Sequence, residues 1–253
     1  MKPLFSIITV TFNAANTLPA TLASVKSQTC QLYEHIIMDG ASKDNTIEIA
    51  KNAGIENLTI TSEPDKGLYD AMNKAIDKST GEYLIFLNAG DAFHSPNTLQ
   101  NIADVIMDND FPGIVYGQTQ LVDNNRNRIG DRHLTAPETL TFKSFAEGMV
   151  VCHQAFIVLR KVAVKYDLKY RFSADYEWCL RCLKRSMNNI YIDETIIDYL
   201  SEGLTTANRK ASLKERFKIM CQYYGTLPTI WRHITFIPRF LKQRKKEKNL
   251  TNK

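Results

Sequence analysis

The sequence contains no apolar run long enough to cross a bilayer, for which about 20 consecutive apolar residues are needed. Its N-terminal apolar stretch, residues 4–10, is short and is not followed by a small-residue cleavage site. We therefore interpret this stretch as a buried strand and not as a signal peptide. The 253 residues, 44% of them apolar, suffice for one sizeable core.

Cysteine is scarce, and its five residues are irregularly spaced, which argues against a disulfide framework. Cys179 and Cys182 form a C-x-x-C pair, but the pair lies within a helical pattern and no second pair follows at zinc-site spacing. We predict that both are small thiols of the core. The cysteine pattern favours a reducing compartment, and we expect a cytoplasmic protein.

The sequence also lacks internal repeats and a G-x-G-x-x-G motif after its first predicted strand, which argues against a nicotinamide-dependent dehydrogenase. Its charge is unevenly distributed, since residues 209–253 hold 13 Lys and Arg against two Glu, whereas residues 1–208 hold 19 basic and 25 acidic side chains. Aromatic residues such as Trp231 and Phe240 lie among the basic ones, which suits a helix on an anionic membrane surface. A solvated charged end is the alternative, and no nucleic-acid recognition motif is present.

In the first half of the chain, short apolar runs alternate with helical patterns. We predict strands at residues 4–12, 34–39, 57–62 and 83–87. We predict a helix capped by Asn16 with the apolar face Leu18, Leu22 and Val25, a helix capped by Asp44 and ending near Gly54, and a helix over residues 68–78. This alternation predicts an α/β fold with a central, mostly parallel sheet flanked by helices.

The second half is less regular. We predict strands at residues 113–122, 126–133, 151–159 and 189–199, and helices at 173–185, 213–224 and 229–244. Residues 1–208 are expected to form one domain, with a donor half over about 1–95 and an acceptor half over about 96–208. A helical, basic C-terminal extension over 209–253 is expected to follow.

Polar clusters follow four successive predicted strands. They read TFN at 11–13, DGAS at 39–42, SEPDKG at 62–67 and NAGD at 88–91. Ligands of open α/β sheets bind at the carboxyl ends of the strands. Loops are polar in general, but four such clusters at one edge of a sheet predict a binding site.

These clusters belong to longer motifs, SIITVTFN at 6–13, DGASKD at 39–44, EPDKGLYDAMNK at 63–74 and GEYLIFLNAGD at 81–91, with SADYE later at 173–177. Their order and spacing resemble the family-2 glycosyltransferases of bacterial exopolysaccharide and cell-surface glycan synthesis. The resemblance implies a GT-A fold, a nucleotide-diphosphate-sugar donor with a UDP-sugar expected, transfer with inversion, and Mn²⁺ or Mg²⁺.

On this resemblance, Thr11, Asn13 and Asp39 are expected at the nucleotide base, where Asp39 would accept a hydrogen bond from a pyrimidine imide. A turn before Gly40 is the alternative role for Asp39. The loop and helix over 65–74 are expected to reach the donor, with Lys66 meeting the diphosphate near a helix N-terminus. Asp70 and Asn73 share a face of that helix and either reach the donor or hold the loop.

In NAGD, Asp91 is the remaining carboxylate, because Asn88 and Gly90 occupy positions that are usually acidic in the family. We expect Asp91 to hold the metal together with donor phosphates, and Asn88 to accept a hydrogen bond from a ribose or sugar hydroxyl. Because the motif keeps a single carboxylate, the alternative of a catalytically weak nucleotide-sugar-binding protein of the same fold stays open.

The resemblance assigns the general base to Asp175, which would take the proton of the acceptor hydroxyl. Glu177, two residues along a helix, would point elsewhere and is the weaker candidate. His153 and Gln154 are expected to line the acceptor side, although a histidine in an apolar run is often a core residue. Residues 201–206 are expected to form a lid. The acceptor is expected to be a glycan or a lipid-linked sugar, at the inner face of the cell membrane.

Overall fold

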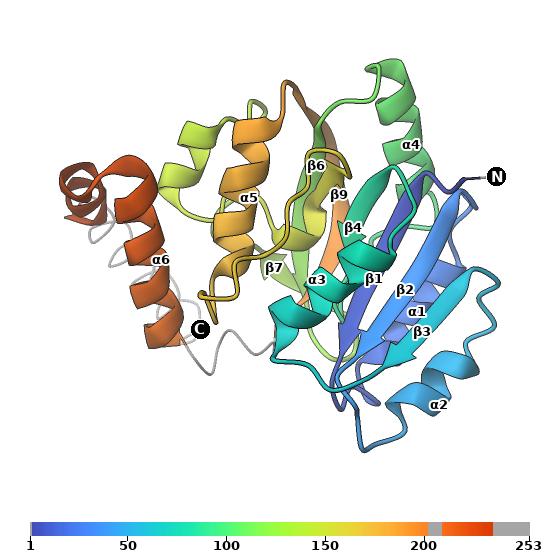
Figure 1. The fold of residues 1–253 in the computed structure, drawn as a ribbon. Helices are drawn as coiled ribbons and strands as arrows, with labels where there is room; N and C mark the ends of the chain where they lie inside the picture. The colour runs from blue at the N-terminus through green and yellow to red at the C-terminus, as the bar shows by residue number, and fades with distance from the viewer. Residues whose placement is uncertain (1, 202–208, 235–253) are drawn as a thin grey trace, which may run out of the picture.

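The computed structural model describes residues 2–201 and 209–234. Its strands form a mixed sheet in the order β3-β2-β1-β4-β8-β6-β9-β5, with β7 paired to β6 (Figure 1). The donor half is parallel: β1 (Phe5–Thr11), β2 (Tyr33–Asp39), β3 (Leu58–Ser62) and β4 (Tyr83–Phe86) run in one direction. This confirms the predicted first-half strands and the α/β fold.

Beyond β4 the sheet changes direction. Strand β8 (Phe156–Leu159) pairs antiparallel to β4 and to β6 (Ile114–Val122), so β6 again runs parallel to β4. The long strand β9 (Asn189–Leu200) lies parallel to β6 on its other side. The carboxyl ends of β1, β4, β6 and β9 therefore meet at one edge of the sheet, and the loops that follow them surround a common region.

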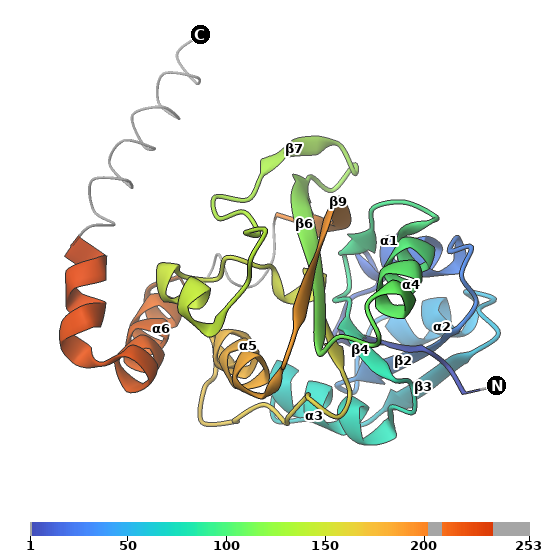
Figure 2. The same ribbon diagram turned by 90° about the horizontal axis from the view of Figure 1, so that it is seen from above.

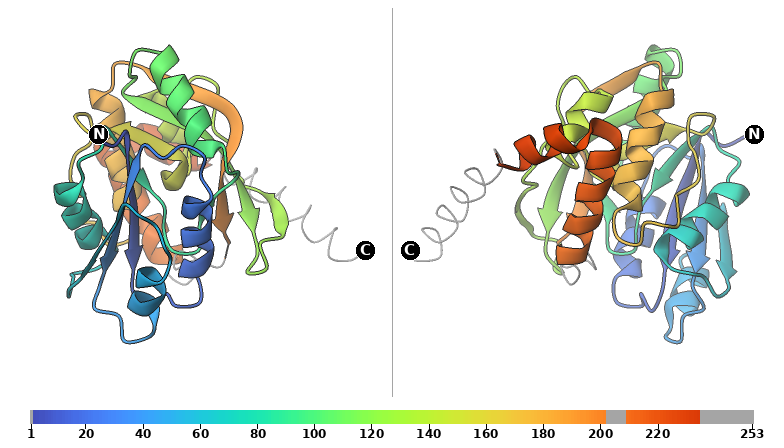
Figure 3. Two further views of the ribbon diagram at one scale, coloured as in Figure 1. Left: turned by 90° about the vertical axis from the view of Figure 1, so that its right-hand side faces the viewer. Right: turned by 60° about the vertical axis from the view of Figure 1, so that its left-hand side comes forward.

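Helices cover both faces of the sheet, as Figure 2 shows. One face carries α1 (Leu18–Lys26) and α4 (Thr98–Asp108), and the other carries α3 (Leu68–Lys78) and α5 (Ala174–Arg185). The short helix α2 (Thr46–Lys51) packs against α1 and β3. Helix α6 (Arg209–Tyr224) lies beside α5 (Figure 3). The predicted apolar face of α1 is buried, since Leu18, Leu22 and Val25 are at most 4% exposed.

Several local predictions need correction. The residue at the N-cap of α1 is Thr17 and not Asn16. Asp44 caps α2 from one position before the Asn45 N-cap, by accepting a hydrogen bond from the Thr46 N–H. The strand predicted from residue 151 begins at Phe156, because His153–Ala155 forms a short 3-10 helix instead of strand.

Three elements in the middle of the chain were not predicted: helix α4, strand β5 and the 3-10 helix η1 (Phe142–Glu147). Helix α4 buries Leu99, Ile102, Ala103 and Ile106, a spacing that is typical of an amphipathic helix. Strand β5 (Ala92–Phe93) is too short for a periodic signal and exists because it pairs with β9. The partner of β6 in the hairpin is β7 (Arg128–Asp131), within the predicted range 126–133. Cys179 and Cys182 are buried and free, as expected for core thiols.

The C-terminal predictions are partly outside the described residues. The helix predicted at 213–224 is α6, which begins earlier, at Arg209. Of the helix predicted at 229–244, the structure describes residues up to 234, and residues 226–234 are helical. The lid predicted at 201–206 lies outside the described residues except for Ser201. In the described part of the chain, no helix is long and apolar enough to span a membrane.

Candidate active site

A pocket of about 290 Å³ opens beside the N-terminus of α5. It is bordered by α3, by the loop after β4, by the segment around η2 (His153–Ala155), and by α5 and α6. We call it the Asp175 pocket. Its lining residues are Leu68, Tyr69, Met72, Asn88, Arg132, Met149, Cys152, His153, Gln154, Phe172, Asp175, Tyr199 and Arg216.

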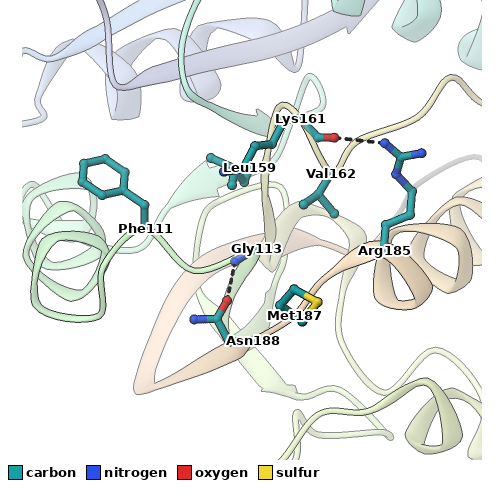
Figure 4. Close-up of a pocket in the computed structure, with 8 residues that line it drawn as sticks. All are labelled: Phe111, Gly113, Leu159, Lys161, Val162, Arg185, Met187 and Asn188. Carbon is teal, nitrogen blue, oxygen red and sulfur yellow. Dashed lines mark hydrogen bonds between the residues drawn. The ribbon is translucent and has the colours of Figure 1, made fainter.

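A second pocket, of about 400 Å³, lies near the amino end of β6 and therefore at the opposite edge of the sheet (Figure 4). Its lining residues are Phe111, Gly113, Leu159, Lys161, Val162, Arg185, Met187 and Asn188. They include two cations and no acidic side chain, so this pocket offers no general base. The Asp175 pocket is therefore the candidate active site.

Asp175 occupies the first turn of α5, where the helix dipole favours a negative charge. Its Oδ1 atom accepts hydrogen bonds from the Tyr69 hydroxyl at 3.2 Å and from the Tyr176 N–H at 2.8 Å. Tyr69 belongs to the EPDKGLYDAMNK motif, so this contact joins the donor half to the predicted base. The carboxylate is half-buried and borders the pocket, which is the placement that a general base needs.

Glu177 does not border this pocket. Its carboxylate is 3% exposed and accepts hydrogen bonds from Arg181 and from the Tyr223 hydroxyl of α6. The structure thus separates the two acids as the helix spacing predicted, and Glu177 links α5 to α6. Its assignment to the acceptor side is not supported by this geometry.

His153 and Gln154, which we expected on the acceptor side, both border the pocket. His153 is packed among the rings of Phe86, Tyr166 and Trp178, and burial lowers its pKa to about 4. Its Nε2 atom lies 2.6 Å from the Tyr166 hydroxyl. A neutral, ring-packed histidine of this kind shapes the floor of the pocket.

Asp91 lies directly behind Gln154. The Gln154 amide donates to Asp91 Oδ2 at 2.6 Å, and the Leu200 N–H at the end of β9 donates to Asp91 Oδ1 at 3.0 Å. Asp91 is 4% exposed, and burial raises its pKa to about 7. The carboxylate is therefore held from two sides by the acceptor half of the chain.

The loop that carries Asp91 also explains the glycine in NAGD. Gly90 has a φ of 104°, a backbone conformation that residues other than glycine rarely adopt. A Cβ atom at this position would also lie only 2.8 Å from Leu200 Cδ2. Thr21 Oγ1 accepts a hydrogen bond from the Gly90 N–H, and the Arg126 guanidinium donates to the Gly90 carbonyl. An acidic residue at position 90 would disturb this packing.

The residues at this loop fit a divalent cation. Asn88 Oδ1 is buried, and it has no hydrogen-bond partner within residues 2–201 and 209–234. An amide oxygen and a carboxylate are ligands suited to Mg²⁺ or Mn²⁺, which also take phosphate oxygens and water. Within the described residues, no group of three His, Cys, Asp or Glu side chains gathers to hold a metal. A cation here would thus depend on the donor phosphates for its remaining ligands.

The predicted base-binding residues meet at the ends of β1 to β3. Asp39 is 2% exposed and accepts hydrogen bonds from the Thr11, Ser42 and Ser62 hydroxyls and from the Ser42 N–H. Burial acts to raise the pKa of Asp39, but these hydrogen bonds outweigh it and hold the pKa below its ordinary value. Asp39 is therefore ionised, and it orders the turn that follows β2.

Asn13 has a φ of 50°, and its Oδ1 atom accepts a hydrogen bond from the Lys43 N–H, which joins the first two strand-end loops. Phe12 beside it is 66% exposed, an aromatic surface that was not predicted. Gly40 packs against both Phe12 and Asp65. The loops after β1, β2 and β3 therefore come close together beside this exposed ring.

At the start of α3, Lys66 is exposed and Asp70 Oδ2 accepts the Lys66 N–H at 3.0 Å. Asp70 thereby holds the residue that precedes the Gly67 N-cap, at the helix N-terminus that we expected to meet the diphosphate. Asn73 is buried, and its amide group exchanges two hydrogen bonds with the backbone of Tyr166. Asp70 thus holds the preceding loop, which was the alternative role. Asn73 instead joins α3 to the segment at Tyr166.

Three residues of the site were not named as candidates from the sequence. Tyr69, Arg132 and Arg216 border the Asp175 pocket but come from α3, from the segment after β7 and from α6. Tyr69 lies within one of the family motifs, whereas Arg132 and Arg216 lie outside all of them. Only the tertiary packing of α6 against α5 and the fold of the segment after β7 bring the two arginines to the Asp175 pocket.

Comparison with known proteins identifies the family of this chain. The family model described as glycosyl transferase family 2 matches residues 6–167. A PGL/p-HBAD biosynthesis glycosyltransferase of Mycobacterium bovis is 37% identical over 187 residues, which cover 71% of this chain and 70% of that protein. The Escherichia coli protein WfgD, a UDP-Glc:alpha-D-GlcNAc-diphosphoundecaprenol beta-1,3-glucosyltransferase, is 24% identical over 86% of this chain and 85% of its own.

Solved structures support the fold. The S. aureus protein TarS (residues 1–349) in complex with UDP-GlcNAc has a TM-score of 0.72 at 18% identity, covering 93% of this chain and 73% of that one. The mannosyltransferase PcManGT of Pyrobaculum calidifontis, solved with GDP-Man and Mn²⁺, has a TM-score of 0.62 at 15% identity, covering 90% and 64%. Because the family model spans more than half of the sequence, the chain belongs to glycosyl transferase family 2 and is a glycosyltransferase.

Proposed function

We propose that this glycosyltransferase moves a sugar from a UDP-sugar to a hydroxyl group of a glycan or lipid-linked acceptor, with inversion at the anomeric carbon. The observation that carries the proposal is the position of Asp175. Its carboxylate borders the pocket and contacts Tyr69 of a donor motif, whereas Glu177 is buried against Arg181 and Tyr223. Asp175 is thus the acid placed to act on an acceptor.

In the proposed reaction, Asp175 takes the proton from the acceptor hydroxyl. The hydroxyl oxygen forms a bond to the anomeric carbon while the bond from that carbon to the diphosphate breaks, and its electron pair leaves with UDP. General-base assistance of this kind contributes roughly 10²–10⁴-fold to the rate. A bound Mn²⁺ or Mg²⁺, held by Asp91 with Asn88, would supply charge stabilisation for the leaving diphosphate.

Both the site geometry and a structural neighbour support a UDP-sugar donor. The ionised carboxylate of Asp39 lies at the end of β2 beside Thr11, near the exposed ring of Phe12. Such a group can accept a hydrogen bond from the imide N–H of uracil once the Ser42 and Ser62 contacts adjust. TarS, which shares the fold, was solved with UDP and with UDP-GlcNAc. Lys66 is exposed and free to reach toward a diphosphate.

We further propose that the enzyme works at the inner face of the cell membrane. In the helical residues 226–234, four large apolar side chains are 41–80% exposed: Leu227, Ile230, Trp231 and Ile234. Their spacing places them on one face of the helix. With the basic residues that surround them in sequence, this face suits an anionic lipid surface.

One experiment tests the central proposal. Purified protein is incubated with UDP-sugars, Mn²⁺ and sugar acceptors, UDP release is measured, and the anomeric configuration of the product is read by proton NMR. We expect acceptor-dependent UDP release and a product of inverted configuration. A retained configuration would contradict the assignment of Asp175. UDP binding without transfer to any acceptor would favour the alternative, a catalytically weak nucleotide-sugar-binding protein, which the occupied hydrogen bonds of Asp91 motivate.

Liposome co-sedimentation tests the membrane proposal. The intact chain should sediment with anionic vesicles at low salt and be released as salt screens the charges. Replacing Leu227 and Trp231 by Gln should reduce sedimentation, whereas Leu168→Gln, another exposed leucine, should not. Equal sedimentation of all these variants, or no sedimentation of the intact chain, would contradict the proposal.

A further inference from the structure

Two arginines share the Asp175 pocket with the proposed base. Arg132 follows β7 and Arg216 lies on α6, so they come from different parts of the chain. Neither guanidinium has an ion-pair partner within residues 2–201 and 209–234. Asp175 is the acidic residue among those lining the pocket, so the lining carries an excess of positive charge.

Both guanidinium groups are held in place and keep unused donors. Arg132 donates from Nη2 to the Met149 carbonyl at 3.1 Å. Arg216 lies over the Tyr176 ring, 5.4 Å from its centroid, and its Nε atom is buried without a hydrogen-bond partner in the described part of the chain. Burying a guanidinium N–H without an acceptor is costly. An anionic ligand in the pocket would supply the missing acceptor.

The position of the pair favours the acceptor over the donor. In a transfer with inversion, the attacking hydroxyl and the leaving diphosphate lie on opposite sides of the anomeric carbon. Arg216 stacks on the residue that follows Asp175, so it lies on the side of the base. Asp39 and Lys66, which we propose for the donor, do not line this pocket, whereas Asn88, which we propose for the metal beside the donor diphosphate, lines it too. The arginines and the donor diphosphate are therefore neighbours, and the test below has to distinguish the two anions.

Resting on the proposed function, we propose that Arg132 and Arg216 form an anion subsite for a phosphate or diphosphate group carried by the acceptor. Arginine forms bidentate hydrogen bonds with phosphate oxygens, which gives such a subsite direction as well as charge. The acceptor class is then a phosphorylated sugar such as a lipid-linked sugar diphosphate. Its hydroxyl faces Asp175 while its phosphate lies between the two arginines. WfgD, a relative of this chain, acts on a sugar joined to a diphosphate lipid.

The test separates the acceptor anion from the donor diphosphate. The protein is first saturated with UDP, with Mn²⁺ in excess over all diphosphate, so that the donor diphosphate position is filled. Geranyl diphosphate is then titrated by calorimetry, with geraniol as the uncharged control. We expect geranyl diphosphate to bind the UDP complex and geraniol to bind at least 10-fold more weakly.

Variants then locate the binding. Arg132→Gln and Arg216→Gln should each weaken geranyl diphosphate binding at least 10-fold and leave UDP affinity within 2-fold. Arg216→Lys, which keeps the charge but not the bidentate geometry, should weaken it less than Arg216→Gln does. Arg128→Gln is the matched control, because Arg128 is exposed and pairs with Asp131 outside the pocket. Thermal midpoints would confirm that each variant is folded.

The outcomes are distinct. If UDP fails to bind the intact protein, the proposed function is wrong, and the titration without UDP still shows whether the two arginines bind an anion. If UDP binds but geranyl diphosphate does not add to it, the acceptor subsite is contradicted. If the Gln variants lose UDP affinity, the pair serves the donor diphosphate and the inference is equally contradicted.

Discussion

The amide of Gln154 donates a hydrogen bond to the carboxylate of Asp91 at 2.6 Å, which ties the acceptor half of the chain to the acid of the NAGD motif. Both side chains are buried. Because Gln154 also lines the Asp175 pocket, this contact places the NAGD loop directly against that pocket. A ligand that moves Gln154 therefore changes the surroundings of Asp91.

Replacing Gln154 by Leu should destabilise the protein by about 1–3 kcal/mol, because one oxygen of a buried carboxylate loses its donor. Urea unfolding would measure this change. Gln100→Leu is the matched control, since the Gln100 amide donates to Asp104 on the exposed surface and its loss should cost far less. Equal stabilities of the two variants would show that the Gln154 contact contributes little.

Asp91→Ala should abolish the metal dependence of UDP binding, because no other acidic side chain remains in the motif. Calorimetry with UDP in the presence and absence of Mn²⁺ would measure it. Asp104→Ala, an exposed acid on α4, is the control and should behave like the intact protein. If the UDP affinity of Asp91→Ala still depended on Mn²⁺ as in the intact protein, the assignment of Asp91 as a metal ligand would be contradicted.

Much of this site could be predicted from the sequence, and the reasons are physical. Strand ends and the motifs that follow them are local, so alternating apolar runs placed Asp39 and Asp91 at one edge of the sheet. The contact between Leu200 and Asp91 could not be predicted, because it depends on how β9 lies beside β6 far along the chain. Arg216 was likewise missed, since only the packing of α6 brings it to the pocket.

The same distinction applies to the roles of individual residues. A helix spacing of two residues correctly separated Asp175 from Glu177. The roles of Asp70 and Asn73 were left open, because the sequence does not show that Tyr166 occupies the Asn73 amide. The short turn at His153–Ala155 was interpreted as strand because its apolar neighbours continue into β8.

Glu215 of α6 should support Asp175 indirectly. Its carboxylate accepts the backbone N–H groups of Arg171, Phe172 and Ser173, which lead into α5. Glu215→Gln should lower the thermal midpoint and reduce kcat more than UDP affinity, because the loop that positions Asp175 loosens. Glu56→Gln, at an exposed site, should change neither. A normal kcat in a destabilised Glu215→Gln would limit Glu215 to a structural role.

His35 in β2 should give the protein a measurable loss of stability in mild acid. Burial lowers its pKa to about 3, against 6.5 for the unfolded chain. As the pH falls below 6.5, the unfolded state gains a proton that the folded state does not bind, so stability decreases. Between pH 7.5 and pH 5 this amounts to about 2 kcal/mol.

The variant His35→Gln, which can still bond to Thr9, isolates this effect. Its stability difference from the intact protein should shrink by about 2 kcal/mol between pH 7.5 and pH 5, and other titrating groups cancel in the difference. Urea unfolding at the two pH values measures it. A pH-independent difference would mean that His35 titrates normally in the folded protein.

The central claim is that Asp175 is the general base, and the turnover of Asp175→Asn tests it most directly. Transfer is measured under saturating donor and acceptor, alongside UDP affinity and the control variant Glu177→Gln. We expect Asp175→Asn to bind UDP as tightly as the intact enzyme and to turn over about 10²-fold more slowly or worse, while Glu177→Gln retains most of its activity. Turnover of Asp175→Asn near that of the intact enzyme would contradict the account.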